Sequence, residues 1–229
     1  MRPPYGGSRV SWSRRRGMTT EDTPCDDTLL KAALRGAALQ GWTRASLSAI
    51  AADAGVSLAE VLRQYPTRAH VLWAWGRAID RAVLAQGVTL DERESVRDRL
   101  FDLLMRRLDA LAPDKEALRA LLPTFGFDPW MAGAVAMGVS RSMALTLEAA
   151  GVGASGPAGH LKVKGLVLIY SHGVRVWLDD DSPDMARTMA ALDKALDRAD
   201  ALAGSLFARS GGACCRGKST DLAAAPEGV

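Results

Sequence analysis

The side chains with the clearest capacity for recognition chemistry lie together in "SLAEVLRQYPTR", residues 57–68. This segment holds a hydroxyl at Ser57, a carboxylate at Glu60, a guanidinium at Arg63 and an amide at Gln64. Such groups can hydrogen-bond to base edges and to phosphate oxygens in nucleic acid. The segment therefore favours binding chemistry over catalysis.

No other cluster has the spacing of a catalytic or metal site. His70, His160 and His172 are far apart in the sequence and have no cysteine or carboxylate at zinc-site spacing. The acidic run "DDDSPD" (179–184) lacks the glycine and the distal glutamate of a calcium loop. No glycine motif for phosphate binding occurs. We therefore expect no enzyme activity, no metal and no cofactor.

The composition indicates a helical protein with a substantial core. Hydrophobic residues make up 48% of the 229 residues, and the abundance of Ala, Leu and Arg favours helix over strand. No run approaches the roughly 20 apolar residues of a membrane-spanning helix. The cysteines (Cys25, Cys214 and Cys215) lie near the two ends, which is typical of a reducing cytoplasm and not of a disulfide framework. We expect a cytoplasmic protein without a membrane span.

Positive charge is concentrated in the N-terminal part of the chain. The net charge is +3. Residues 1–90 carry twelve Lys and Arg against seven acidic residues, whereas residues 91–208 carry fourteen against seventeen. A basic N-terminal third can attract nucleic acid. Because the excess is small, we expect tight binding to need more than one copy.

Start and stop signals predict two short helices inside residues 26–85. Ser46 is the N-cap of one helix, and Gly55 ends it. Ser57 starts the next helix and forms a Ser-x-x-Glu capping box with Glu60. Two short helices joined by a glycine-containing turn are typical of a helix-turn-helix, whose second helix enters the major groove. The alternative is a tight corner in an ordinary helical bundle.

Two longer helices flank this pair. Apolar positions at helical spacing predict a helix that starts near Thr28 and ends at Gly41. Pro66 ends the second short helix, and Thr67 is expected to cap a long helix that follows.

The segment "LSAIAADAGVSLAEVLRQYPTRAHVL" resembles the N-terminal domain of TetR-type transcriptional regulators. The matching residues are Ile50-Ala51, Ala54-Gly55-Val56-Ser57, Tyr65-Pro66-Thr67-Arg68 and Val71-Leu72, and the resemblance covers residues 28 to about 85. It implies an all-α protein with an N-terminal three-helix helix-turn-helix head and a C-terminal helical ligand-binding and dimerisation bundle. Such a protein binds a double-stranded DNA operator as a homodimer and responds to a small lipophilic effector, most often as a repressor.

The resemblance also implies DNA contacts before the first short helix, along the second, and at the start of the helix that follows. These residues are Arg44, Ser46, Ser57, Leu58, Ala59, Glu60, Leu62, Arg63, Gln64, Tyr65 and Arg68. Two of them depart from the family pattern. Leu62 replaces a tyrosine that contacts phosphate, and Glu60 stands where small or hydroxylated residues are common.

Residues 86–208 are predicted to form the ligand-binding and dimerisation domain. Amphipathic helices are expected over 94–111, 114–127 and 128–151, then a nearly all-apolar helix over 160–180. Met and aromatic side chains suit an adaptable lipophilic site. The candidate pocket residues are Met105, Phe125, Phe127, Trp130, Met137, Met143, Tyr170 and His172; the alternative for each is core packing.

A last helix is predicted to begin with Ser182 as N-cap and Pro183 in the first turn. Its apolar residues recur at steps of four and three, which indicates a seam for a dimeric four-helix bundle. The seam consists of Met185, Met189, Leu192, Leu196, Ala199, Ala203 and Leu206. The alternative is that this seam packs inside its own monomer.

The two ends, residues 1–25 and 209–229, have the composition of disordered tails. Arg14, Arg15 and Arg16 in the first tail could form a basic arm along phosphates.

A second resemblance gives an alternative function. "GWTRASLSAIAADAG" and "WLDDDSPDMARTMAALDKAL" are similar to a TetR-fold accessory family of ubiquinone biosynthesis. That family binds isoprenoid lipid and not DNA. Leu62 and Glu60 favour this alternative, whereas the retained Arg63 and Arg68 favour DNA binding.

Overall fold

The computed structural model describes residues 24–42, 44–87 and 94–210. This part of the chain contains nine α-helices, two 3-10 turns and no strand, which confirms the all-α prediction. The predicted tails, including the basic run Arg14–Arg16, lie almost wholly outside the described residues. No helix in the described ranges is long and apolar enough to cross a membrane.

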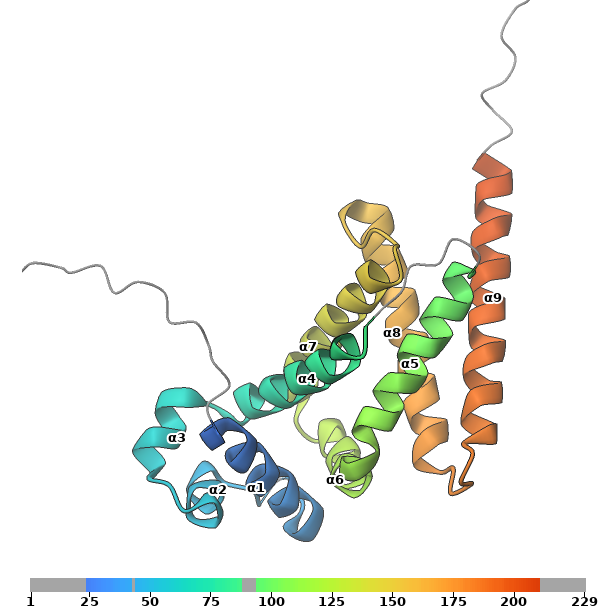
Figure 1. Cartoon of the computed structure of the whole chain (residues 1–229). Coiled ribbons are helices and arrows are strands. Elements are labelled where there is room, and N and C mark those ends of the chain that lie inside the picture. The colour runs from blue at the N-terminus through green and yellow to red at the C-terminus, as the bar shows by residue number, and fades with distance from the viewer. Residues whose placement is uncertain (1–23, 43, 88–93, 211–229) are drawn as a thin grey trace, which may run out of the picture.

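Three N-terminal helices form a compact unit, the head, at one end of the molecule (Figure 1). They are α1 (Pro24–Gln40), α2 (Leu47–Ala54) and α3 (Leu58–Gln64). The next helix, α4 (Arg68–Ala85), leads from the head into the rest of the protein (Figure 1).

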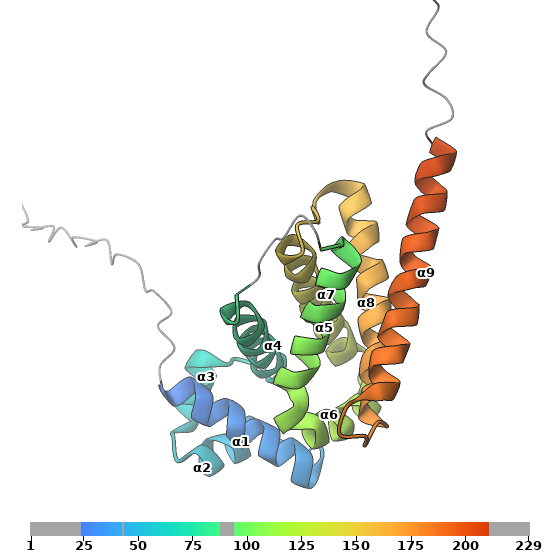
Figure 2. The ribbon, with the colours of Figure 1, turned by 45° about the vertical axis from the view of Figure 1, so that its right-hand side comes forward.

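The remaining helices form a second unit, the body, into which α4 packs. They are α5 (Val96–Leu111), α6 (Lys115–Leu121), α7 (Pro129–Ala149), α8 (Gly156–Leu178) and α9 (Ala186–Ser210), with 3-10 turns η1 (Ala112–Asp114) and η2 (Leu122–Gly126). α7 packs between α4 and α8, and α9 packs along α8 and α5, as Figure 2 shows. The head contacts the body where α1 lies against α6.

The predicted caps place α2 and α3. Ser46 Oγ accepts a hydrogen bond from Ala49 N at 3.1 Å, and Ser57 Oγ accepts one from Glu60 N at 3.2 Å. Gly55 ends α2 with φ of 69°, a left-handed conformation that glycine adopts without strain. The caps were predicted correctly, but Glu60 does not complete the box, because its carboxylate accepts from Arg63 instead.

The start of α9 differs from the prediction. The helix begins at Ala186 and not beside Ser182, because the buried carboxylate of Asp180 takes over the capping role. Asp180 accepts from Thr188 N at 2.9 Å, from Thr188 Oγ1 at 2.7 Å and from Ser182 Oγ at 2.5 Å. The Ser182 and Thr188 hydrogen bonds hold the pKa of Asp180 well below its usual range.

α8 is longer than predicted and less buried. It starts at Gly156, four residues before the predicted start at residue 160. One face carries Tyr170, Val174 and Trp177 into the core, but Leu161 and Leu168 on another face are 66% and 72% exposed.

Candidate nucleic-acid interface and ligand cavity

The leading end of α3 is presented to solvent. Ser57, Leu58 and Ala59 are exposed, and Leu58 keeps 42% of its surface accessible. Behind them Val61 is fully buried and holds α3 against the head core. α3 packs on α2 and lies at the outer edge of the head, remote from α8 and α9 (Figure 1). This geometry is that of a helix-turn-helix whose second helix is free to enter a groove.

The middle of α3 carries one ion pair. Arg63 donates to the Glu60 carboxylate, and this bond lowers the pKa of Glu60 below its usual value. Leu62 is 44% exposed and presents an apolar surface where a phosphate contact was expected. Because Glu60 and Arg63 are the only charged residues of α3, the helix itself has no net charge.

The other predicted DNA contacts divide into exposed and packed residues. Arg44 and Ser46 are exposed before α2, and Gln64 is half-buried at the end of α3. Tyr65 was predicted to lie along the groove, but its ring is only 4% exposed and packs in the head core. Arg68 is half-buried and donates to the Trp42 carbonyl at 3.0 Å, so it braces the head.

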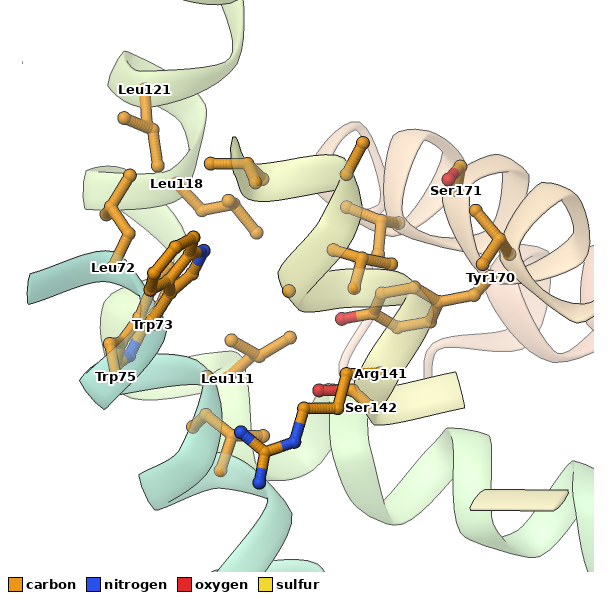
Figure 3. A pocket seen from close by; sticks show the side chains of 18 of the residues that line it. Leu72, Trp73, Trp75, Leu111, Leu118, Leu121, Arg141, Ser142, Tyr170 and Ser171 are labelled. Carbon is orange, nitrogen blue, oxygen red and sulfur yellow. The ribbon is translucent and has the colours of Figure 1, made fainter. Parts of the chain in front are cut away.

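A cavity of about 540 Å³ opens within the body, between α4, α6, α7 and α8, with α5 at its base. Figure 3 shows Leu72, Trp73, Leu118 and Leu121 along its apolar walls. The volume lies within the usual range for a small-molecule site, roughly 300–1,000 Å³. The body therefore contains a preformed space for a ligand.

One polar corner interrupts the apolar lining. Arg107 and Asp80 form a buried ion pair, with 7% and 12% of their side chains exposed. Ser142 Oγ donates to the other oxygen of Asp80 at 2.8 Å. The Arg107 guanidinium lies 5.4 Å from the centre of the Tyr170 ring, and Tyr170 reaches from α8 into the cavity (Figure 3). This corner gives an otherwise apolar site a fixed polar end.

Three of the predicted pocket residues line this cavity and five do not. Phe125, Met137 and Tyr170 line the cavity, whereas Met105 and Met143 pack into the core beside it. Phe127 and Trp130 flank the start of α7 and are 90% and 85% exposed. His172 is exposed on α8, because two residues of helix place it about 200° around the axis from Tyr170.

The sequence interpretation missed the residues of α4 and α5 that line the cavity, among them Trp73, Trp75, Asp80 and Arg107. A signal for Arg107 was available. It stands three or four residues from Leu103, Leu104 and Leu111, on the apolar stripe of α5. A charged residue on such a stripe indicates a buried partner.

The predicted dimer seam on α9 packs inside the monomer at its centre. Leu192 and Leu196 are 1% and 4% exposed, and a methyl group added at Gly173 of α8 would lie 2.5 Å from Leu192 Cδ2. Met185, Met189 and Ala199 are half-buried, and the side chains of Ala203 and Leu206 lie outside the described part. The seam assignment was therefore wrong for Leu192 and Leu196, which join α9 to its own α8.

The cavity is physically connected to the head. α4 and α6 both line the cavity, and both contact α1. Trp75 of the cavity wall donates from its indole to Asp114 Oδ2 at 2.9 Å, which ties α4 to the turn before α6. A change in the spacing of α4 and α6 would therefore reach α1.

Comparison with known proteins supports the fold. No protein-family model matches the sequence, and no curated protein matches it significantly. Among solved structures, a TetR transcriptional regulator from Nitrosomonas europaea ATCC 19718 has 26% identity and a TM-score of 0.63, with 78% of this chain and 99% of that chain covered. A TetR transcriptional regulator from Rhodococcus sp. RHA1 has 20% identity and a TM-score of 0.53, with 77% and 96% covered. The chain has the fold of TetR-type transcriptional regulators.

Proposed function

We propose that this protein is a cytoplasmic, homodimeric DNA-binding regulator, acting as a repressor, that releases its operator when a small lipophilic molecule fills the body cavity. The observation that carries the proposal is the exposed leading end of α3 on a capped and internally braced helix-turn-helix. The solved structures of the same fold are themselves described as transcriptional regulators.

The accessory function in ubiquinone biosynthesis is not favoured. It would leave the start of α3 without a role, although Ser57, Leu58 and Ala59 are all exposed there. Both of the solved structures named above are described as regulators.

Two copies are proposed to pair through α8 and not through the α9 seam. Leu161 and Leu168 stand seven residues apart, so they lie on the same side of the helix. Both are exposed, while the apolar face of α9 is already covered by its own α8. Pairing matters for DNA binding because the head, residues 24–64, carries four basic and four acidic residues and so has no net positive charge to attract DNA. Two linked heads bind with much higher avidity than one.

The proposed switch is a population shift between two spacings of the heads. A ligand can move this equilibrium only as far as its affinity differs between the two states. α4 and α6 enclose the cavity and also contact α1. An occupied cavity that favours a wider separation of α4 and α6 would tilt the head and misalign α3 with its groove.

The direct test of the proposal is DNA binding by the purified chain. We expect it to retard a fragment of the region upstream of its own gene, as a dimer, with two protomers per site. Because phosphate contacts release counterions, log affinity should fall linearly with log salt concentration. Fluorescence anisotropy across a salt series measures the slope, and analytical ultracentrifugation measures the stoichiometry. Equal affinity for an unrelated fragment at every salt concentration would contradict the proposal.

The Trp75–Asp114 hydrogen bond offers a test of the coupling. Trp75→Phe keeps an aromatic ring in the cavity wall but removes the donor to Asp114. We expect DNA affinity without ligand to stay within about fivefold, because the bond contributes only about 1 kcal/mol. The ligand-induced loss of DNA affinity should shrink, because α4 is no longer tied to the turn before α6.

Trp73→Phe serves as the matched control, since its indole bonds to Ala134 O within α7 at 2.7 Å and not to the turn before α6. The coupling route is wrong if both variants respond to ligand like the wild type.

A further inference from the structure

The cavity lining has an unbalanced charge. Its charged residues are one aspartate and four arginines: Asp80, Arg77, Arg107, Arg141 and Arg175. Asp80 is already engaged by Arg107 and Ser142. The other three arginines therefore leave the lining with three uncompensated positive charges.

These three arginines, here called the rim arginines, lie where the cavity meets solvent. Arg77, Arg141 and Arg175 come from α4, α7 and α8, and each lines the cavity while remaining exposed. Figure 3 shows Arg141 extending beside Ser142 at the edge of the site. Across the described ranges none of the three forms a hydrogen bond or ion pair with a protein group. The guanidinium groups of Arg77 and Arg141 are available to an external anion, and Arg175 adds its charge from the side of α8 that carries Leu168.

The interior behind the rim is apolar and mostly aliphatic. Leu, Ile and Val are the largest group of lining residues and come from all five of the helices around the cavity, with Trp73, Trp75 and Phe125 among them. An aliphatic chain buried there gains about fourfold in affinity for each methylene group removed from water. A purely polar anion would make no apolar contact with this wall, and a neutral hydrocarbon would make no ion pair with the rim arginines.

We propose that the cavity takes an amphiphilic carboxylate, with its aliphatic body inside and its carboxylate on the rim arginines. Arginine suits this role because its planar guanidinium can bind a carboxylate through two parallel hydrogen bonds. A cationic head group is disfavoured, because it would approach three positive charges. This ligand assignment rests on the proposed function in one respect: both take this cavity as the effector site.

The test measures ligand binding directly, without DNA, so it is independent of whether the protein is a regulator. Decanoate, decanol and decylammonium share one chain and differ in head-group charge. Isothermal titration calorimetry should show decanoate binding more tightly than decanol and decylammonium binding weakest. The total tryptophan fluorescence is a second readout, because Trp73 and Trp75 line the cavity. Equal or tighter binding of decanol or decylammonium, or binding of none of the three, overturns the proposal.

A double variant tests whether the rim arginines contact the carboxylate head group. Arg77→Gln with Arg141→Gln should weaken decanoate binding about fivefold and leave decanol binding unchanged, because exposed ion pairs are individually modest. Arg175 is left in place because it lies seven residues after Leu168, on the proposed dimer face of α8. Arg198→Gln, an exposed arginine of α9 outside the cavity, is the matched control. Unchanged decanoate affinity in the double variant overturns the rim assignment.

Discussion

Replacing Ala59 with glutamate is expected to weaken operator binding at least 100-fold while leaving the fold intact. Ala59 lies at the exposed leading end of α3, so the new carboxylate would face the phosphates and base edges of the groove. Juxtaposed like charges cost several kcal/mol, and about 2.7 kcal/mol already corresponds to 100-fold. The dimer carries the change twice. Fluorescence anisotropy with the upstream fragment measures the loss.

Stability should not fall, because glutamate near a helix N-terminus interacts favourably with the helix dipole. Thermal unfolding followed by circular dichroism checks this. Ala82→Glu on the exposed side of α4, outside the cavity, adds the same charge away from the head and should leave DNA affinity unchanged. Equal loss in the two variants would show that net charge, and not the position of α3, controls binding.

Local signals predicted the head well because its geometry is set by neighbouring residues. Ser46, Gly55 and Ser57 each fix a helix end through a contact within a few positions, so sequence order alone places them. Local signals did not determine the orientation of the Tyr65 side chain. The motif marks its position, but only the packing of α3 against the head decides that its ring turns inward.

Long-range packing accounts for the predictions that were wrong. An apolar heptad on α9 is compatible with a partner chain or with a neighbour in the same chain, because both present the same kind of surface. Gly173 decides between them: it lets α8 approach closely enough for Leu192 to pack against its backbone. The cavity residues were missed for a related reason, since Trp73, Trp75 and Asp80 look like ordinary residues of an amphipathic helix until α7 and α8 enclose them.

Replacing Asp80 with alanine is expected to lower the free energy of unfolding by about 3–5 kcal/mol, because it leaves the buried Arg107 charge unpaired. For a protein of this size that corresponds to a fall in Tm of roughly 10 °C. The Ser142 hydroxyl also loses its acceptor. Urea unfolding followed by circular dichroism measures the change, and Asp109→Ala, at an exposed carboxylate on α5, is the control expected to have little effect.

The double variant Asp80→Ala, Arg107→Met separates charge from packing. Removing both charges eliminates the unpaired cation, so the double variant should be more stable than Asp80→Ala alone. If it is equally unstable, lost packing and not the buried charge explains the single variant. Both residues line the cavity, so Asp80→Ala changes the polar end of the cavity as well as the stability. Replacing Arg77 and Arg141 should weaken ligand binding alone, because those exposed side chains hold no part of the core in place.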